Sequence, residues 1–222
     1  MKKIMLNDQF GLTQAVLEGR KTQTRRIVPS IPCYAVKGNG KLKYLFAEDL
    51  QMRGNTLMLF INNEWHEAPK QSQPKYNIGE IVAVAQSYNE IWNTQEEDFR
   101  IKIGMQDEYS GFIYTKFIEN GGWNNKMFVC AEAMPHHILI TNVKVERLQE
   151  ISDENCMKEG VIHYDDIIGE GYMLAEPYNN SYRRHCFTTP RKAFATLIDK
   201  VSGKGTWEKN PWVFVYEFEL VK

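Results

Sequence analysis

The chain has few cysteines and arranges none of them in a motif. Cys33, Cys130, Cys156 and Cys186 are scattered through 222 residues without a Cys-x-x-Cys pair. This spacing fits neither a zinc knuckle nor a dense disulfide framework, so we expect reduced, structural thiols. The adjacent His136 and His137 would point to opposite faces of a strand, and no carboxylate lies at ligand spacing from them. We therefore predict no metal site and no cofactor.

Long hydrophobic runs and an excess of charge are also missing. The apolar run at Ile4, Met5 and Leu6 is broken by Asn7 and Asp8, so it is too short for the core of a signal peptide. No stretch approaches the ~20 apolar residues of a membrane span. We expect a cytoplasmic protein with no membrane contact. The formal net charge of −1 excludes a surface coated in positive charge, so any nucleic-acid contact should be a local patch.

Positive charge is concentrated in one short segment, from Gly19 to Arg26. Its sequence is Gly-Arg-Lys-Thr-Gln-Thr-Arg-Arg. Gly19 follows apolar residues at helical spacing and predicts the end of a helix, whereas the β-branched Ile27 and Val28 predict a strand after the segment. The turn should hold the cations in fixed positions that suit an anionic or strongly polar ligand. These cations are Arg20, Lys21, Arg25 and Arg26.

Period-two hydrophobicity predicts three further strands. From Pro211 to Val221 large apolar residues fall on one face, and Glu217 and Glu219 on the other, which is typical of a half-buried strand. We expect this strand to close the fold. His136 to Leu148 alternates in the same way, and the continuous apolar run in Gly79 to Ala85 predicts a strand buried on both sides.

Capping residues predict two helices after the long central strand. Ser152 is a good N-cap for a helix over residues 153–159. A second helix should begin at Pro190, behind Thr189, and end at Gly203.

Asparagine and glycine turns between short alternating runs predict a hairpin-rich insertion at about residues 29–75, projecting as an appendage. Residues 89–127 should contain one or two further hairpins. The fold class is therefore mostly β with peripheral helices (α+β), organised as one closed β-barrel that carries two insertions.

The cationic segment resembles the signature of the ASCH family, a branch of the PUA-like superfamily of small β-barrels. The signature consists of Gly19, Lys21, Thr24 and Arg26. Other blocks are similar to phage-associated and bacterial ASCH proteins, namely residues 76–80, 145–152 and 203–212. The resemblance implies a single PUA-like barrel over residues 1–222.

The resemblance also implies a function. PUA-like domains commonly bind RNA or modified bases, so RNA or a modified nucleoside or nucleotide is the implied partner, held in a basic cleft. One small ASCH group resembles amidohydrolases that remove the acetyl group of acetylated cytidine with a lysine, a threonine and a glutamate. Lys21 and Thr24 match the first two, and Glu159 is our candidate for the third, ahead of Glu154 and Glu150. Gln86 stands where relatives usually carry a glutamate.

Three hypotheses follow, and the residues leave all of them open. The first is RNA or modified-nucleotide binding through the cations. The second is an amidohydrolase in which Thr24 is the nucleophile and Lys21 the base, with a pKa lowered by burial or neighbouring arginines. Ideal strand geometry puts residues three apart on opposite faces, so this second hypothesis requires the turn to persist past Lys21. The third is a phage-related adaptor that contacts another protein.

Overall fold

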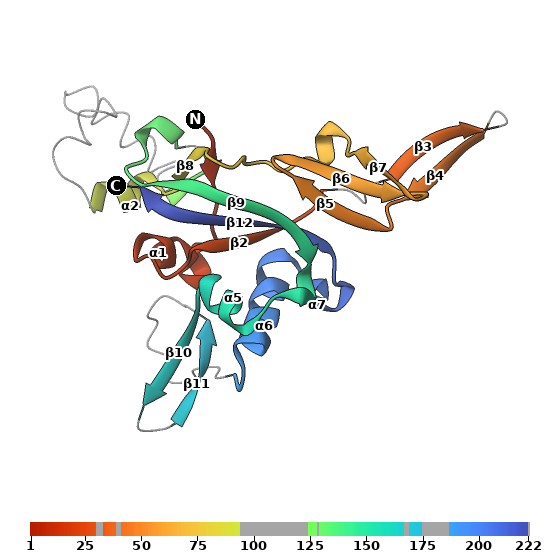
Figure 1. The fold of residues 1–222 in the computed structure, drawn as a ribbon. Coiled ribbons are helices and arrows are strands. Elements are labelled where there is room, and N and C mark those ends of the chain that lie inside the picture. Colours follow the sequence, from red (N-terminus) through yellow and green to blue (C-terminus); the bar gives the residue numbers. More distant parts are fainter. Residues whose placement is uncertain are drawn as a thin grey trace.

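The computed structural model describes residues 1–29, 33–38, 41–93, 124–127, 129–166, 169–174 and 187–221. Its helices and strands are arranged as Figure 1 shows. In chain order they are β1 (Lys3–Ile4), η1 (Asp8–Phe10), α1 (Leu12–Leu17), β2 (Gln23–Ile27), β3 (Cys33–Gly38), β4 (Lys41–Phe46), β5 (Asp49–Arg53), β6 (Thr56–Ile61), β7 (Glu64–Glu67), η2 (Lys70–Ser72), β8 (Ile81–Val84), α2 (Tyr88–Asn93), η4 (Ala131–Ala133), β9 (His137–Arg147), η5 (Leu148–Glu150), α5 (Asp153–Lys158), β10 (Val161–Asp166), β11 (Gly169–Leu174), α6 (Pro190–Ser202), α7 (Thr206–Lys209) and β12 (Trp212–Val221).

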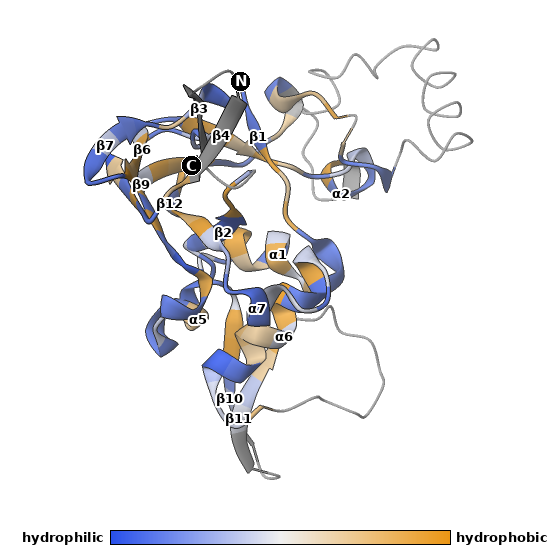
Figure 2. Ribbon diagram, turned by 90° about the vertical axis from the view of Figure 1, so that its right-hand side faces the viewer, coloured by the Kyte–Doolittle hydropathy of each residue, from blue (hydrophilic) through white to orange (hydrophobic). Residues whose placement is uncertain are grey.

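A five-stranded sheet forms the centre of the molecule, in the order β1-β8-β9-β12-β2. Strands β1 and β8 are parallel, and the other neighbours are antiparallel. The long strands predicted around residues 136–148 and 211–221 are confirmed as β9 and β12. Figure 2 shows hydrophobic stretches on the strands of this sheet and on α1 and α6.

The last strand is more deeply buried than its alternating pattern predicts. Phe214, Tyr216 and Phe218 are buried as expected, but Val213 and Val215 on the opposite face are buried too. The strand lies inside the sheet, between β9 and β2. Val213 and Val215 pack in the same main core as Phe214 and Tyr216, so the first half of the strand is buried on both faces.

The expectation of a closed barrel is wrong for the described residues. Within the described residues the central sheet has two edge strands, β1 and β2, and these do not pair with each other. Strand β1 is only two residues long, Lys3–Ile4, so it offers little backbone for closing a sheet. The broad α+β class stands, with mostly strands.

The predicted helix ends are confirmed by their caps. Gly19 has φ 72°, in the left-handed region, and ends the turn after α1. The Ser152 hydroxyl accepts a hydrogen bond from the Asn155 amide at the start of α5 (3.2 Å). The Thr189 hydroxyl does the same for the Lys192 amide at the start of α6 (3.2 Å).

The region predicted as a hairpin-rich insertion forms the β3–β4 hairpin and the three-stranded sheet β5-β6-β7. The turn between β6 and β7 uses Asn62 and Asn63, both with positive φ, as a tight hairpin requires. The expectation of a projecting appendage fits β3 and β4, which extend to one side in Figure 1. It does not fit β6, because Leu57 and Leu59 are fully buried in the main core.

Residues 89–127, expected to form hairpins, lie mostly outside the described residues. Residues 89–93 belong to the helix α2 instead.

Cys130 and Cys156 carry free thiols, and burial raises the pKa of Cys156 to about 12.

Candidate functional site

The cationic segment begins in a turn that α1 and α5 hold from both sides. The Lys21 amide donates to the Ala15 carbonyl of α1 (2.9 Å), and the Thr22 amide donates to the Lys158 carbonyl of α5 (3.0 Å). Strand β2 starts one residue later. These bonds fix the entry of β2 and direct the Lys21 side chain inward, where it is 2% exposed.

Lys21 forms a buried ion pair with Glu159, at 2.6 Å between Nζ and Oε2. Its Nζ also donates to the Glu159 carbonyl (2.8 Å) and to the Gln23 carbonyl (2.7 Å). The three acceptors match the three N–H donors of an ammonium group. Burial lowers the pKa of Lys21, while the Glu159 carboxylate acts in the opposite direction.

Arg25 extends this pair into a cluster. It forms an ion pair through Nη1 with Glu159 (3.0 Å) and through Nη2 with Glu146 of β9 (2.7 Å), and its side chain is fully buried. The guanidinium also lies over the ring of Phe194 in α6, at 5.9 Å from the centroid. We call Lys21, Arg25, Glu146 and Glu159 the buried ion cluster, which joins β2, β9 and the end of α5.

Gly160 makes the placement of Glu159 possible. Glu159 ends α5, and Gly160 then turns the chain with φ 104°, which disfavours residues with a side chain. A Cβ at this position would lie 3.4 Å from Leu12 Cδ2 and 3.8 Å from Lys21 Cδ. The helix can therefore stop against the Lys21 side chain, and Glu159 projects directly onto it.

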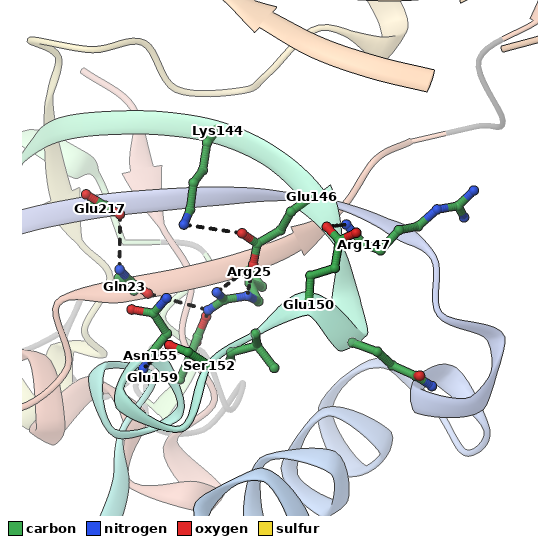
Figure 3. A network of polar contacts seen from close by, with 12 residues as sticks. Gln23, Arg25, Lys144, Glu146, Arg147, Glu150, Ser152, Asn155, Glu159 and Glu217 are labelled. Carbon is green, nitrogen blue, oxygen red and sulfur yellow. Dashed lines mark hydrogen bonds and ion pairs between the residues drawn. The ribbon is translucent and has the colours of Figure 1, made fainter. Parts of the chain in front are cut away.

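A layer of polar side chains covers the side of the central sheet that faces α5 (Figure 3). Alternation along β2 puts Gln23 and Arg25 on this side. The strand register places Glu217 beside both Gln23 and Asn142, and Val215 beside both Arg25 and Lys144. We call this layer the polar face. Its members are Gln23, Arg25, Asn142, Lys144, Glu146 and Glu217.

Hydrogen bonds connect the polar face in two groups, which Gln23 links because its Oε1 accepts from Arg25 Nη1 (3.5 Å). Glu217 accepts from Gln23 Nε2 (3.1 Å) and from Asn142 Nδ2 (3.4 Å), forming a row across three strands that we call the amide row. Lys144 Nζ pairs with Glu146 at 3.2 Å. Lys144 and Glu217 are partly exposed and Asn142 is exposed, so this part of the face reaches the surface.

The other expected site residues lie elsewhere. Thr24 is on the opposite side of β2, buried and beside Tyr216 in the register. Arg26 shares that side and donates to the Met5 carbonyl. Arg20 is exposed and pairs with Glu18 at 2.5 Å. No hydrogen bond within the described residues joins Thr24 to Lys21 or to Glu159.

The structure therefore brings together two members of the expected catalytic set, Lys21 and Glu159, and separates Thr24 from them. The weaker candidates for the third member are engaged at the surface. Glu154 pairs with Lys158 along α5 (2.6 Å), and Glu150 accepts from the Arg147 amide (2.9 Å).

Gln86, the departure from the ASCH pattern, is buried after β8 and contacts His136. Its Oε1 lies 2.8 Å from His136 Nδ1. Burial, and secondarily the neighbouring His137, lowers the pKa of His136.

Sequence reasoning missed the partners of the cations. Glu146, which pairs with Arg25, lies in a strand more than a hundred residues away in the sequence, and so does Glu217, which accepts from the Gln23 amide. The local sequence pattern does not show which charges such distant strands bring to the site. The available signal was parity: the alternation of the last strand had already placed Glu217 on its polar side.

No family model matches the chain, and neither a curated protein nor a solved structure matches it. In the part of the chain that is described, no helix is long and apolar enough to cross a membrane. The same residues contain no group of three or more His, Cys, Asp or Glu side chains that could hold a metal ion.

Proposed function

We propose that this chain binds RNA or a modified nucleotide mainly through the base, on the polar face, and not through the phosphate backbone. One observation carries the proposal. The cations that seemed available for phosphate have partners within the chain: Lys21 and Arg25 pair with Glu159 and Glu146 in the interior, and Arg20 pairs with Glu18 at the surface. Arg26 donates to the Met5 carbonyl.

The charge balance of the site supports base recognition. Three cations, Lys21, Arg25 and Lys144, stand against three carboxylates, Glu146, Glu159 and Glu217. A polyanion gains little from a neutral surface, because phosphate binding depends on unpaired lysines and arginines that displace counterions. A base edge instead requires fixed hydrogen-bond donors and acceptors. Amide and carboxylate groups held by strand register provide them. The resemblance to ASCH proteins points to the same class of ligand.

The geometry gives less support to the amidohydrolase alternative. Each N–H of the Lys21 ammonium group has an acceptor, so its nitrogen has no lone pair with which to take a proton from a hydroxyl. Thr24 also faces the other side of the sheet. A nucleophile and its base need to lie within hydrogen-bond reach of each other.

Calorimetric titration of the protein with free nucleosides and with a short single-stranded RNA tests the proposal, at two salt concentrations. We expect nucleoside binding that is nearly independent of salt. For the RNA, the logarithm of the binding constant should fall with the logarithm of the salt concentration with a total slope well below ~0.7, the value for a single neutralised phosphate on a single strand. Asn142→Ala should weaken nucleoside binding several-fold. The matched control is Asn77→Ala, an exposed asparagine in the turn before β8.

Two results would contradict base-directed binding. One is RNA affinity that falls steeply with salt while free nucleosides do not bind, since this indicates a backbone site. The other is release of acetate from acetylated cytidine by the wild type and not by Thr24→Val, which would establish the hydrolase instead. If the protein binds neither nucleosides nor RNA, the adaptor hypothesis is the one that remains.

A further inference from the structure

The three carboxylates on the α5 side of the sheet are satisfied in different ways. Glu159 pairs with Lys21 and Arg25, and Glu146 pairs with Arg25 and Lys144. Glu217 has no ion pair within 4.0 Å among the described residues. Its hydrogen-bond donors are the amides of Gln23 and Asn142, and the Lys158 ammonium of α5 interacts with it electrostatically from beyond ion-pair distance.

Glu217 therefore keeps capacity for a ligand. A carboxylate offers about four lone-pair sites, and each Glu217 oxygen accepts one amide hydrogen bond. One site on each oxygen remains, and the side chain is only partly buried. The two amides come from neighbouring strands in register, so they hold the carboxylate in a fixed orientation between them.

The two oxygens of a carboxylate held in a fixed orientation favour one kind of ligand group. They match two adjacent N–H donors, in the way that a carboxylate receives a bidentate guanidinium. On the Watson–Crick edges of the common bases, only guanine presents two neighbouring donors, at its ring nitrogen N1 and its exocyclic amine. Adenine and cytosine place a ring-nitrogen acceptor next to their amine, and that lone pair would face a carboxylate oxygen.

We propose that Glu217 is the specificity-determining residue of the site and selects a base with two adjacent N–H donors, of the guanine type. This inference rests on the proposed function, because it assumes that a base binds on the polar face. It goes further in naming the edge that is read and in assigning the reading to one side chain. Gln23 and Asn142 are positioning residues for that carboxylate.

Competitive titration with guanosine, inosine, cytidine and acetylated cytidine tests the proposal. Inosine keeps the N1 donor and lacks the exocyclic amine, so it isolates the second hydrogen bond. We expect guanosine to bind roughly tenfold or more tightly than inosine, the range for one good bidentate contact against its mismatch. Glu217→Gln replaces one acceptor by a donor, so it should remove most of this preference for guanosine.

The matched control is Glu219→Gln, the same chemical change two residues along β12 at an exposed glutamate. It should leave the ratio of guanosine to inosine affinity unchanged. Thermal unfolding of each variant checks folding. If Glu217→Gln does not fold, the wild-type ratio decides, together with Glu217→Asp, which keeps the carboxylate and withdraws it by one methylene.

The outcomes separate the two proposals. Equal binding of guanosine and inosine, tighter binding of acetylated cytidine, or an unchanged ratio in Glu217→Gln overturns the assignment of Glu217 and leaves base binding intact. Absence of binding to every nucleoside overturns both. A selective loss of guanosine affinity in Glu217→Gln, with Glu219→Gln unaffected, supports both.

Discussion

The buried ion cluster and the amide row lie on the same side of one sheet, and both contain a strand glutamate held by side chains of β2. In the cluster, two cations and two carboxylates are desolvated together and each satisfies the others. In the row, a single carboxylate is held by two neutral amides near the surface. The difference separates charges that are buried and paired with one another from a charge that stays partly exposed and has amide hydrogen-bond donors.

Burial explains why the cluster must be complete. Moving an ion out of water costs several kcal/mol, and only partners with good geometry offset that cost. Removing one member leaves an uncompensated charge in the interior. Removing one member of the amide row does not leave an uncompensated buried charge, because Glu217 remains partly hydrated and amide donors form hydrogen bonds to either oxygen.

The largest effect should come from breaking the cluster at its centre. Lys21→Met keeps the length of the side chain but leaves Glu159 without the cation that accounts for its closest contact. We expect a loss of roughly 3–5 kcal/mol in the free energy of unfolding, measured by urea denaturation. Arg20→Met is the matched control in the same segment. It should change stability little, because Arg20 and Glu18 are exposed.

A double variant sharpens this first test. Lys21→Met combined with Glu159→Met removes both ions of the pair and leaves Arg25 with Glu146. Replacing a buried ion pair by apolar groups is often close to neutral, so the double variant should be more stable than Lys21→Met alone. A double variant less stable than the single one would show that the pair contributes more than mutual neutralisation.

The regular elements of the fold could be predicted because their signals are local. The long strand around residues 136–148, the strand at 211–221 and the helix starting at Ser152 all carry their period or cap in consecutive residues. Closure of the sheet has no such signal. It depends on whether the two edge strands β1 and β2, which stand at opposite ends of the strand order of the sheet, pair with each other, and alternation within a strand does not encode that. The burial of Leu57 and Leu59 in the main core is hidden for the same reason.

The site was predictable in part. The turn at Gly19 and the helix end at Gly160 indicate that Lys21 and Glu159 are held in place, and they do meet. The side of the sheet on which Thr24 lies follows from the alternation of side chains along a strand, once β2 is known to begin at Gln23. The neutralisation of Arg25 could not be read from its own segment, because Glu146 arrives from a strand that pairs with β12 and not with β2.

An identical substitution in the two regions compares them directly. Glu159→Gln removes a charge that two buried cations require, and we expect a loss of roughly 2–4 kcal/mol in unfolding free energy. Glu217→Gln removes a partly exposed charge whose hydrogen-bond donors are amides, and we expect a change below about 1 kcal/mol. Urea denaturation of both variants under one set of conditions measures the difference. Equal losses would mean that the amide row contributes as much to the free energy of unfolding as the cluster does.

The smallest expected effect comes from turning an amide contact into an ionic one. Gln86 contacts His136, whose pKa is lowered from its ordinary 6.5, first by burial. Such a histidine contributes stability that is present above pH 6.5 and is lost as pH falls through the lowered pKa, because the unfolded chain takes up the proton first.

Gln86→Glu places a carboxylate beside the imidazole and should raise the His136 pKa, because a neighbouring negative charge favours the protonated ring. The loss of stability at low pH then becomes smaller, and it reverses where the pKa exceeds 6.5: the contribution of His136 is in that case present below pH 6.5 and is lost as pH rises. NMR titration of the His136 ring protons, assigned with His136→Gln, measures the pKa in both proteins. Urea denaturation at pH 5.5 and 7.5 checks the reversal. A wild-type pKa at or above 6.5, or no increase in Gln86→Glu, would show that the contact between these two side chains is too solvated to respond as the cluster does.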